Sequence, residues 1–174
     1  MVLERLSKIP IFANVPRSAL EDLITHCAPI RYPPKKVVFS QGDAANYAVL
    51  LIEGKMAVSI ETKGRPRQID DIRSGELVGE AGLFIAGGRR SATITTTMPS
   101  TCLTLTPAIF RSASDNPAVI ALEMYLIKEN LRRIRGTHRE VQKIWRTLQD
   151  PNEVDERSSP TLLERLQGLL RGWK

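Results

Sequence analysis

The sequence predicts a mainly β fold with α-helical flanks: a jelly-roll-like β-barrel (a double-stranded β-helix) with N-terminal helices and a long C-terminal helix. Three observations carry this prediction. Short apolar runs alternate with glycine turns between Lys36 and Thr106. Helical spacing precedes these runs, and a heptad pattern follows Pro107. Many short strands at regular turn spacing favour a sandwich or a closed barrel, which hides its strand edges.

The first segment, from Leu3 to about Cys27, has a helical pattern. Leu20 and Leu23 recur at helical spacing, and Pro16 suits a first helical turn, where its missing N–H is not needed. Pro33-Pro34 then interrupts the chain. We therefore expect short helices here, followed by a change to β structure.

The middle of the chain contains the strand candidates. They are residues 37–40, 47–52, 56–60, 68–72, 92–96 and 102–105. Turn sequences containing Gly42, Gly54, Gly64 and Gly75 separate most of them, and glycine supplies the positive φ that tight turns require. One long stretch, Gly79–Ser91, interrupts this regularity with several glycines and two adjacent arginines. Long irregular insertions in compact barrels are often functional, so we expect the site there.

The sequence after Pro107 predicts a long helix with one apolar stripe. The stripe consists of Ile120, Met124, Ile127, Leu131, Ile134, His138, Val141, Trp145 and Leu148. Its strict 4-3 spacing is typical of a coiled-coil seam, whereas a helix packed on its own barrel usually has a wider stripe. We predict a homodimer through the helix at about 118–149, with packing on the chain's own barrel as the alternative.

These patterns predict one domain at residues 1–149, which includes the long helix. A polar linker follows at 150–159, and Ser159 is a suitable N-cap for a short amphipathic tail helix at 160–174. The tail's leucines and Trp173 are expected to pack on the domain or to dock a partner. Attachment of the tail to a membrane surface is a weaker alternative.

The net charge, the number of cysteines and the lengths of the apolar runs limit which classes of protein this chain can belong to. The net charge is +6, and much of the excess lies between Lys128 and Arg146. This basic segment is interpreted as the solvated face of a helix, or else as a surface for an acidic partner or polyanion. Two cysteines are too few for a disulfide framework. No apolar run approaches the roughly 18 residues of a membrane span, and no secretory signal is present, so we expect a cytoplasmic protein.

An enzymatic function has no support in the sequence. No Ser/His/Asp or Cys/His arrangement suggests nucleophilic catalysis, and no metal-ligand spacing is present. Asp70 and Asp71 are consecutive in a strand candidate, so their side chains point to opposite faces. We therefore expect neither catalytic residues nor a metal or other cofactor.

The residues of the Gly79–Ser91 stretch indicate an anionic ligand that carries a sugar. A helix that begins near Gly79-Glu80 presents free N–H groups and the positive end of its dipole to a phosphate. Arg90 can pair with that phosphate through two charge-assisted hydrogen bonds. Glu80 would repel a phosphate, but it can accept hydrogen bonds from sugar hydroxyls.

Two motifs, Val78-Gly-Glu-Ala-Gly-Leu-Phe and Gly88-Arg-Arg-Ser-Ala-Thr, resemble the phosphate-binding cassette of cyclic-nucleotide-binding domains. The resemblance is closest to the bacterial catabolite activator proteins and runs from about Ile9 to about Leu148. It implies that Glu80 binds the ribose 2′-hydroxyl and that Arg90 binds the cyclic phosphate of cAMP or cGMP. Backbone N–H groups from Gly79 to Ala81 would complete the phosphate cradle.

The resemblance implies two further contacts with the ligand, and the sequence departs from the family pattern at three points. Ser91 would add a hydroxyl near the phosphate or the purine, and Thr137 of the long helix would touch the base. Ala81 replaces a larger aliphatic residue, and Arg89 adds a second arginine beside Arg90. Residues 150–174 are too short for the winged helix-turn-helix of the transcription factors. We therefore do not expect direct sequence-specific DNA binding.

The predicted function is a cyclic-nucleotide sensor that signals to an unknown effector protein through its C-terminal helix. cAMP is the first candidate ligand, and cGMP is the second. The main alternative is a protein-interaction module with a vestigial, ligandless cassette. A nucleic-acid binder is a third interpretation that rests on charge alone.

Overall fold

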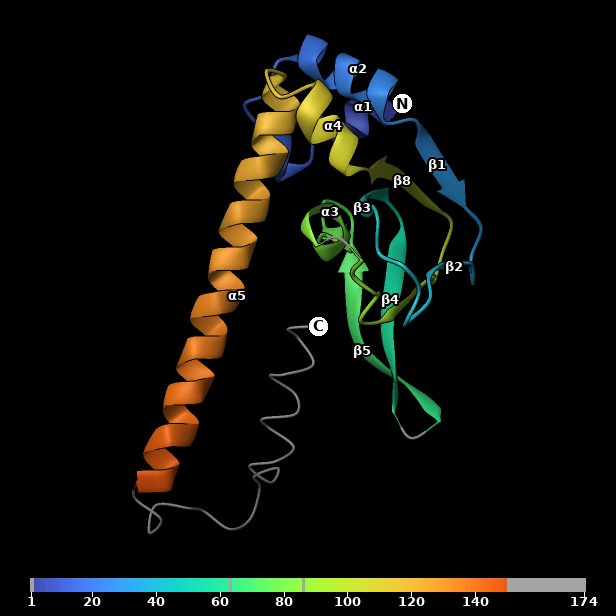
Figure 1. Ribbon diagram of the computed structural model, residues 1–174. Helices are drawn as coiled ribbons and strands as arrows, with labels where there is room; N and C mark the ends of the chain where they lie inside the picture. Colours follow the sequence, from blue (N-terminus) through green and yellow to red (C-terminus); the bar gives the residue numbers. More distant parts are fainter. Residues whose placement is uncertain (1, 63, 86, 150–174) are drawn as a thin grey trace. The chain divides into compact units, whose positions relative to one another are not determined.

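The computed structural model describes residues 2–62, 64–85 and 87–149, with the side chains of 147–149 left out. The chain divides into two compact units, Met1–Tyr125 and Leu126–Lys174, and each is described by itself. The predicted linker and tail helix lie outside the described residues. In chain order the elements (Figure 1) are α1 (Val2–Leu6), η1 (Pro10–Phe12), α2 (Arg17–His26), β1 (Pro29–Tyr32), β2 (Val37–Phe39), β3 (Ala48–Glu53), β4 (Lys55–Thr62), β5 (Arg65–Arg73), β6 (Leu77–Val78), α3 (Ala81–Phe84), β7 (Thr93–Thr96), β8 (Ser100–Leu105), α4 (Pro107–Ser112) and α5 (Pro117–Gln149).

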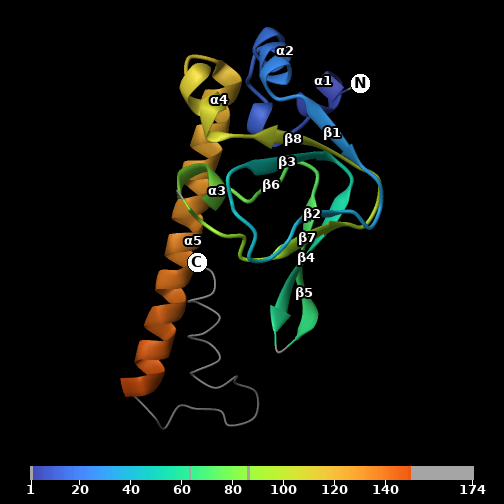
Figure 2. The same cartoon turned by 45° about the vertical axis from the view of Figure 1, so that its right-hand side comes forward.

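The first unit contains two antiparallel four-stranded sheets. Their strand orders are β1-β8-β3-β6 and β2-β7-β4-β5. Figure 2 shows them as separate layers, with β3 and β8 in one layer and β4 and β7 in the other. The predicted mainly β fold of the jelly-roll type, with helical flanks and a long C-terminal helix, is confirmed.

The expectation of a closed barrel is wrong, since no described strand pairs across the two sheets. The edges need no closure, because they are protected in other ways. The edge strand β6 is only two residues long. The edge strand β5 carries charged side chains and a bulge opposite Val58/Ser59, where Ile69 has no partner in the ladder.

The core lies between the sheets and explains why these segments are strands. Every residue of β3 from Ala48 to Ile52 is buried, whereas exposure alternates along β7. One cluster of buried side chains joins the layers; it consists of Phe39, Val49, Leu51, Met56, Ile72, Ile94 and Cys102. Phe39, at the end of β2, therefore packs in the middle of the domain.

The start of α5 is fixed to α2 within the first unit. Asn116 precedes Pro117, and its Oδ1 accepts the N–H of Ala118 at 2.7 Å, so it caps the helix. Its Nδ2 donates to the carbonyl of Ala19 at 3.1 Å and to Asp22 Oδ2 at 2.6 Å. This buried amide determines where the helix begins and ties it to the N-terminal helices. None of the described helices is both long and apolar enough to cross a membrane.

Candidate functional site

The glycine-rich stretch predicted as the site links β6 to β7 and contains the one-turn helix α3. Gly79 lies between β6 and α3 with φ +78°. A Cβ at Gly79 would lie 2.8 Å from Phe39 Cε2 and would also overlap Arg90 Nη1. Gly79 is therefore required both by its backbone conformation and by the close approach of Arg90.

The start of α3 has the form expected of an anion-binding turn. Glu80 is in the N-cap position and half-buried, and Ala81 is the first helical residue. The N–H groups of Gly82 and Leu83 donate to the carbonyls of Gly79 and Glu80 at 3.0 and 2.9 Å. The N–H of a first helical residue has no acceptor inside its own helix, so that of Ala81 can reach a ligand.

Arg90 points into the domain and lies beside Gly79. The residue is only 6% exposed. Its Nη1 donates to the carbonyl of Gly79 at 3.2 Å, and its Nη2 donates to the carbonyl of Tyr47 at 2.7 Å. The guanidinium carbon lies 3.6 Å from the centroid of the Phe39 ring. The predicted pair of Gly79 and Arg90 is thus brought together by the fold.

The Arg90 guanidinium stays positively charged although it is buried. Burial lowers the pKa of the Arg90 guanidinium, and the nearby Tyr47, Asp43 and Glu80 partly oppose this shift. An arginine starts from so high a pKa that it remains protonated at neutral pH. The site therefore holds a permanent positive charge that is largely shielded from water, which favours an anionic ligand.

The backbone around Arg90 is held by the turn after β2. The N–H of Arg90 donates to the carbonyl of Asp43, and its carbonyl accepts the N–H of Gly42, both at 2.8 Å. The N–H of Ala45 donates to the carbonyl of Gly88 at 2.8 Å. These bonds place the return of the loop beside the start of α3.

The two adjacent arginines have different surroundings. Arg89 is exposed, and its Nη1 donates to the carbonyl of Gly42 at 2.8 Å. Arg90 is buried and faces Gly79. This difference supports the choice of Arg90 over Arg89 as the phosphate ligand.

The remaining predicted residues lie at the surface or in the other unit. Ala81 and Ser91 are both exposed at the two ends of the stretch. Thr137 is half-buried in the part of α5 that belongs to the second unit. Its contact with the base therefore stays a prediction.

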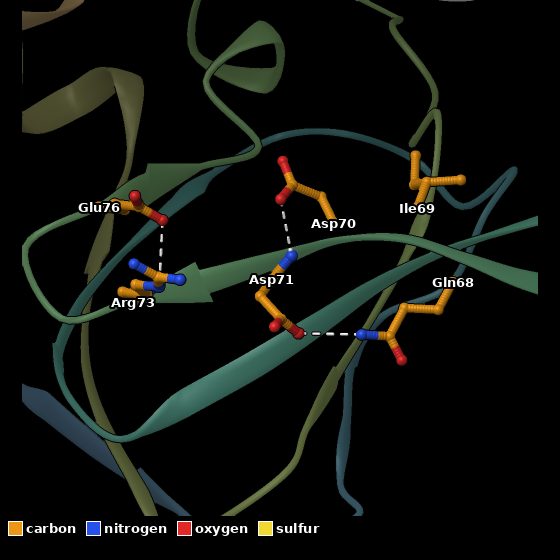
Figure 3. A pocket seen from close by; sticks show the side chains of 6 residues that line it. All are labelled: Gln68, Ile69, Asp70, Asp71, Arg73 and Glu76. Carbon is orange, nitrogen blue, oxygen red and sulfur yellow. Dashed lines mark hydrogen bonds between the residues drawn. The ribbon is translucent and has the colours of Figure 1, made fainter.

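A separate hollow of about 520 Å³ lies along the edge strand β5 and is shown in Figure 3. Its acidic side chains all have partners. Asp71 pairs with Lys55 at 2.7 Å and accepts from Gln68 at 2.9 Å, and Asp70 and Glu76 accept backbone N–H groups at 2.8 and 2.9 Å. An acidic lining repels a phosphate, so the anion site is not here. No cluster suited to a metal ion occurs among the described residues.

Sequence reasoning missed the aromatic surroundings of Arg90. Phe39 and Tyr47 were assigned only to strand candidates. No local pattern relates either side chain to an arginine that follows more than 40 positions later. Their role follows from packing alone.

Comparison with known proteins identifies the family. Residues 29–116 match the family model described as the cyclic nucleotide-binding domain, and this match covers half of the chain. The chain belongs to this family. The matched range includes the whole Gly79–Ser91 stretch, which we now call the cassette.

Several relatives of this cyclic nucleotide-binding domain are regulators. The cAMP-activated global transcriptional regulator CRP of Pasteurella multocida is 31% identical over 127 residues, which is 72% of this chain and 59% of that protein. The match thus spans between 28% and 59% of the length of the curated relatives.

Solved structures share the fold. The catabolite activator protein of Thermus thermophilus superposes with a TM-score of 0.61 at 24% identity and covers 78% of this chain and 63% of its own. A variant of a cAMP-binding acyltransferase from Mycobacterium smegmatis has a TM-score of 0.61 at 25% identity over 78% of this chain and 41% of that one.

Proposed function

We propose that this domain is a cyclic-nucleotide sensor whose ligand is cAMP, with cGMP as the second candidate. The observation that carries the proposal is the buried Arg90 guanidinium, which lies against Gly79 at the start of α3. A cation shielded from water beside the backbone N–H of Ala81, the first residue of α3, is suited to bind a phosphate.

The other cassette residues fit the rest of this ligand. Glu80 would accept a hydrogen bond from the ribose 2′-hydroxyl, and Ala81 would donate its backbone N–H to the phosphate. Ser91, which is exposed at the end of the cassette, would supply a hydroxyl to the phosphate or the purine. Thr137 of α5 would contact the base. The ligand needs no cofactor or metal ion.

The proposed sensor is a homodimer through α5. Large apolar side chains of the predicted seam are 45–63% exposed in the single chain; they are Ile120, Met124, Ile127, Leu131, Ile134, Val141 and Trp145. A second copy of the helix would bury all of them in one coiled-coil interface. The ligand would then favour one arrangement of cassette and helix, which passes the signal to an effector protein.

The proposed role is regulatory and not catalytic. One relative, the acetyltransferase Pat of Mycolicibacterium smegmatis, is named for an enzymatic activity, but the match covers only 28% of that protein. The proposal assigns the cassette residues Glu80, Arg90 and Ser91 to ligand binding alone. Direct DNA binding is not part of the proposal, and the cytoplasmic location stays a prediction.

Calorimetric titration of ligand-free protein with cAMP and with cGMP tests the proposal. We expect saturable binding of one nucleotide, which Arg90→Ala abolishes. A folded, ligand-free protein that gives no heat with either nucleotide would refute it. That result would favour the alternative of an interaction module with a vestigial cassette.

A further inference from the structure

Two aromatic side chains, which also pack against each other, contact the guanidinium of Arg90. Its central carbon lies 3.6 Å from the ring centroid of Phe39 and 4.8 Å from that of Tyr47. The two rings pack edge to face, with centroids 5.2 Å apart and planes inclined at 63°. We call Phe39 and Tyr47 the aromatic clamp. Phe39 is only 4% exposed, so its contact with the cation is shielded from water.

The clamp, and not a carboxylate, makes direct contacts with the guanidinium, although the nearby Asp43 and Glu80 partly oppose the lowering of its pKa by burial. Among the residues that the structure describes, Arg90 forms no ion pair within 4.0 Å, and its only side-chain hydrogen bonds go to the carbonyls of Gly79 and Tyr47. Carbonyl dipoles and aromatic faces favour a cation without neutralising it. A carboxylate would neutralise the charge and would compete with a phosphate for the same N–H groups.

The clamp also leaves hydrogen-bond donors available. A guanidinium has five N–H donors, and the two carbonyl bonds of Arg90 use two of them. The two printed bonds come from Nη1 and Nη2, and no bond from Nε is found among the described residues, so the Nε–H is a donor that a ligand can use. A phosphate can therefore bind at this edge while both carbonyl bonds and both ring contacts are kept.

We propose that Phe39 and Tyr47 are positioning residues for the ligand phosphate: their two rings pack against each other and against the Arg90 guanidinium, and they hold it so that its remaining N–H groups are available to the ligand. This inference rests on the proposed function, because it takes the ligand of Arg90 to be a cyclic phosphate. It assigns a binding role to two side chains outside the cassette. Neither ring needs to touch the nucleotide.

The test removes one ring at a time and keeps an apolar side chain. In Phe39→Leu and in Tyr47→Leu we expect cAMP affinity to fall about tenfold, as for the loss of one desolvated cation–π contact. Tyr47→Phe keeps the ring and the backbone carbonyl, so its affinity should stay within about twofold of wild type. Phe12→Leu is the matched control, since it makes the same substitution at a buried phenylalanine of η1.

A second ligand separates positioning from a general loss of structure. Adenosine lacks the phosphate, so its binding, followed by NMR titration, should be equal in wild type and Phe39→Leu. Equal weakening of cAMP and adenosine by Phe39→Leu would overturn the positioning role. Unchanged cAMP affinity in both leucine variants would overturn it as well.

A third measurement needs no nucleotide and keeps the two proposals distinguishable. A ring 3.6 Å from the guanidinium should shift the Nε–H resonance of Arg90 upfield in the free protein, and Phe39→Leu should remove that shift. Arg90→Lys assigns the resonance. An unshifted resonance in wild type would overturn the clamp itself. Wild type that has the shift but binds no cyclic nucleotide would refute the proposed function, and the positioning role with it.

Discussion

Replacing Gly79 by alanine tests how closely the cassette packs around Arg90. Gly79 has φ +78°, and an L-residue in the left-handed region costs about 1–2 kcal/mol of stability. Its new Cβ would also lie 2.8 Å from Phe39 Cε2 and overlap Arg90 Nη1. Forcing a methyl group into packed surroundings costs a further ~1–3 kcal/mol. The variant should therefore lose about 2–5 kcal/mol of unfolding free energy.

Gly64→Ala is the matched control, because Gly64 has nearly the same backbone conformation without the contact. Its φ is +73°, and nothing lies within 4 Å of the position of a Cβ. It should lose only the backbone cost of about 1–2 kcal/mol. The difference between the two variants thus measures the close approach to Phe39 and Arg90.

Urea unfolding gives both free energies, and calorimetry gives the affinity for cAMP. We expect Gly79→Ala to bind about tenfold more weakly or worse, since each 1.4 kcal/mol of displaced Arg90 contact is a factor of ten. Gly64→Ala should bind like wild type. The reasoning is refuted if the two variants are equally stable and Gly79→Ala binds cAMP normally.

Three further predictions concern the seam, the sugar contact and the thiols. In the proposed dimer, Ile134→Asp should produce a monomer in sedimentation equilibrium. Ile69→Asp on β5 is the control and should leave the dimer intact, since the two isoleucines are 55% and 53% exposed. Glu80→Gln should weaken cAMP binding about tenfold or more, since a hydrogen bond to a charged group contributes about 1.5–3 kcal/mol. The affinity for 2′-deoxy-cAMP, which lacks the ribose 2′-hydroxyl, should not change. Equal losses of affinity for both ligands would contradict the ribose contact. Burial raises the pKa of Cys27 from 9.0 to about 11 and that of Cys102 from 9.0 to about 12, so both thiols stay protonated at pH 8. Above about pH 9 the unfolded chain loses these protons while the folded chain keeps them, so the free energy of unfolding falls as the pH rises. Labelling of folded protein by a thiol reagent at pH 8 should be as slow as unfolding, and faster labelling would refute this.

The strands that the sequence predicted are those with a clear apolar pattern. The buried run of β3 and the alternating β7 were found in nearly the right places. β1 and β6 were missed, because β1 begins at Pro29 and β6 has only two residues. Both depend on ladder pairing with strands far along the chain, which local propensity does not register.

The cassette was predictable because its chemistry is local. Gly79, Glu80 and Arg90 occur within one stretch, and their residue types predict an anion site before any fold is known. Phe39 and Tyr47 reach Arg90 only because β2, the start of β3 and the end of the cassette converge in the core. The prediction of a closed barrel was wrong for a different reason: regular strand spacing is equally compatible with two open sheets, which is what the structure has.

The surroundings of Arg90 give a physical reason why this domain can detect an anion. An arginine that is paired with a carboxylate must break that pair before a phosphate can use its donors, and the exchange gains little free energy. Arg90 is held instead by two carbonyls and two aromatic faces, none of which carries a full charge. Burial disfavours the cation, and Tyr47, Asp43 and Glu80 oppose this effect only in part. A phosphate at the free edge of Arg90 would add a counter-charge in direct contact with the guanidinium. Part of the cost of burying the cation would thus be recovered on binding, and only an anion can supply it.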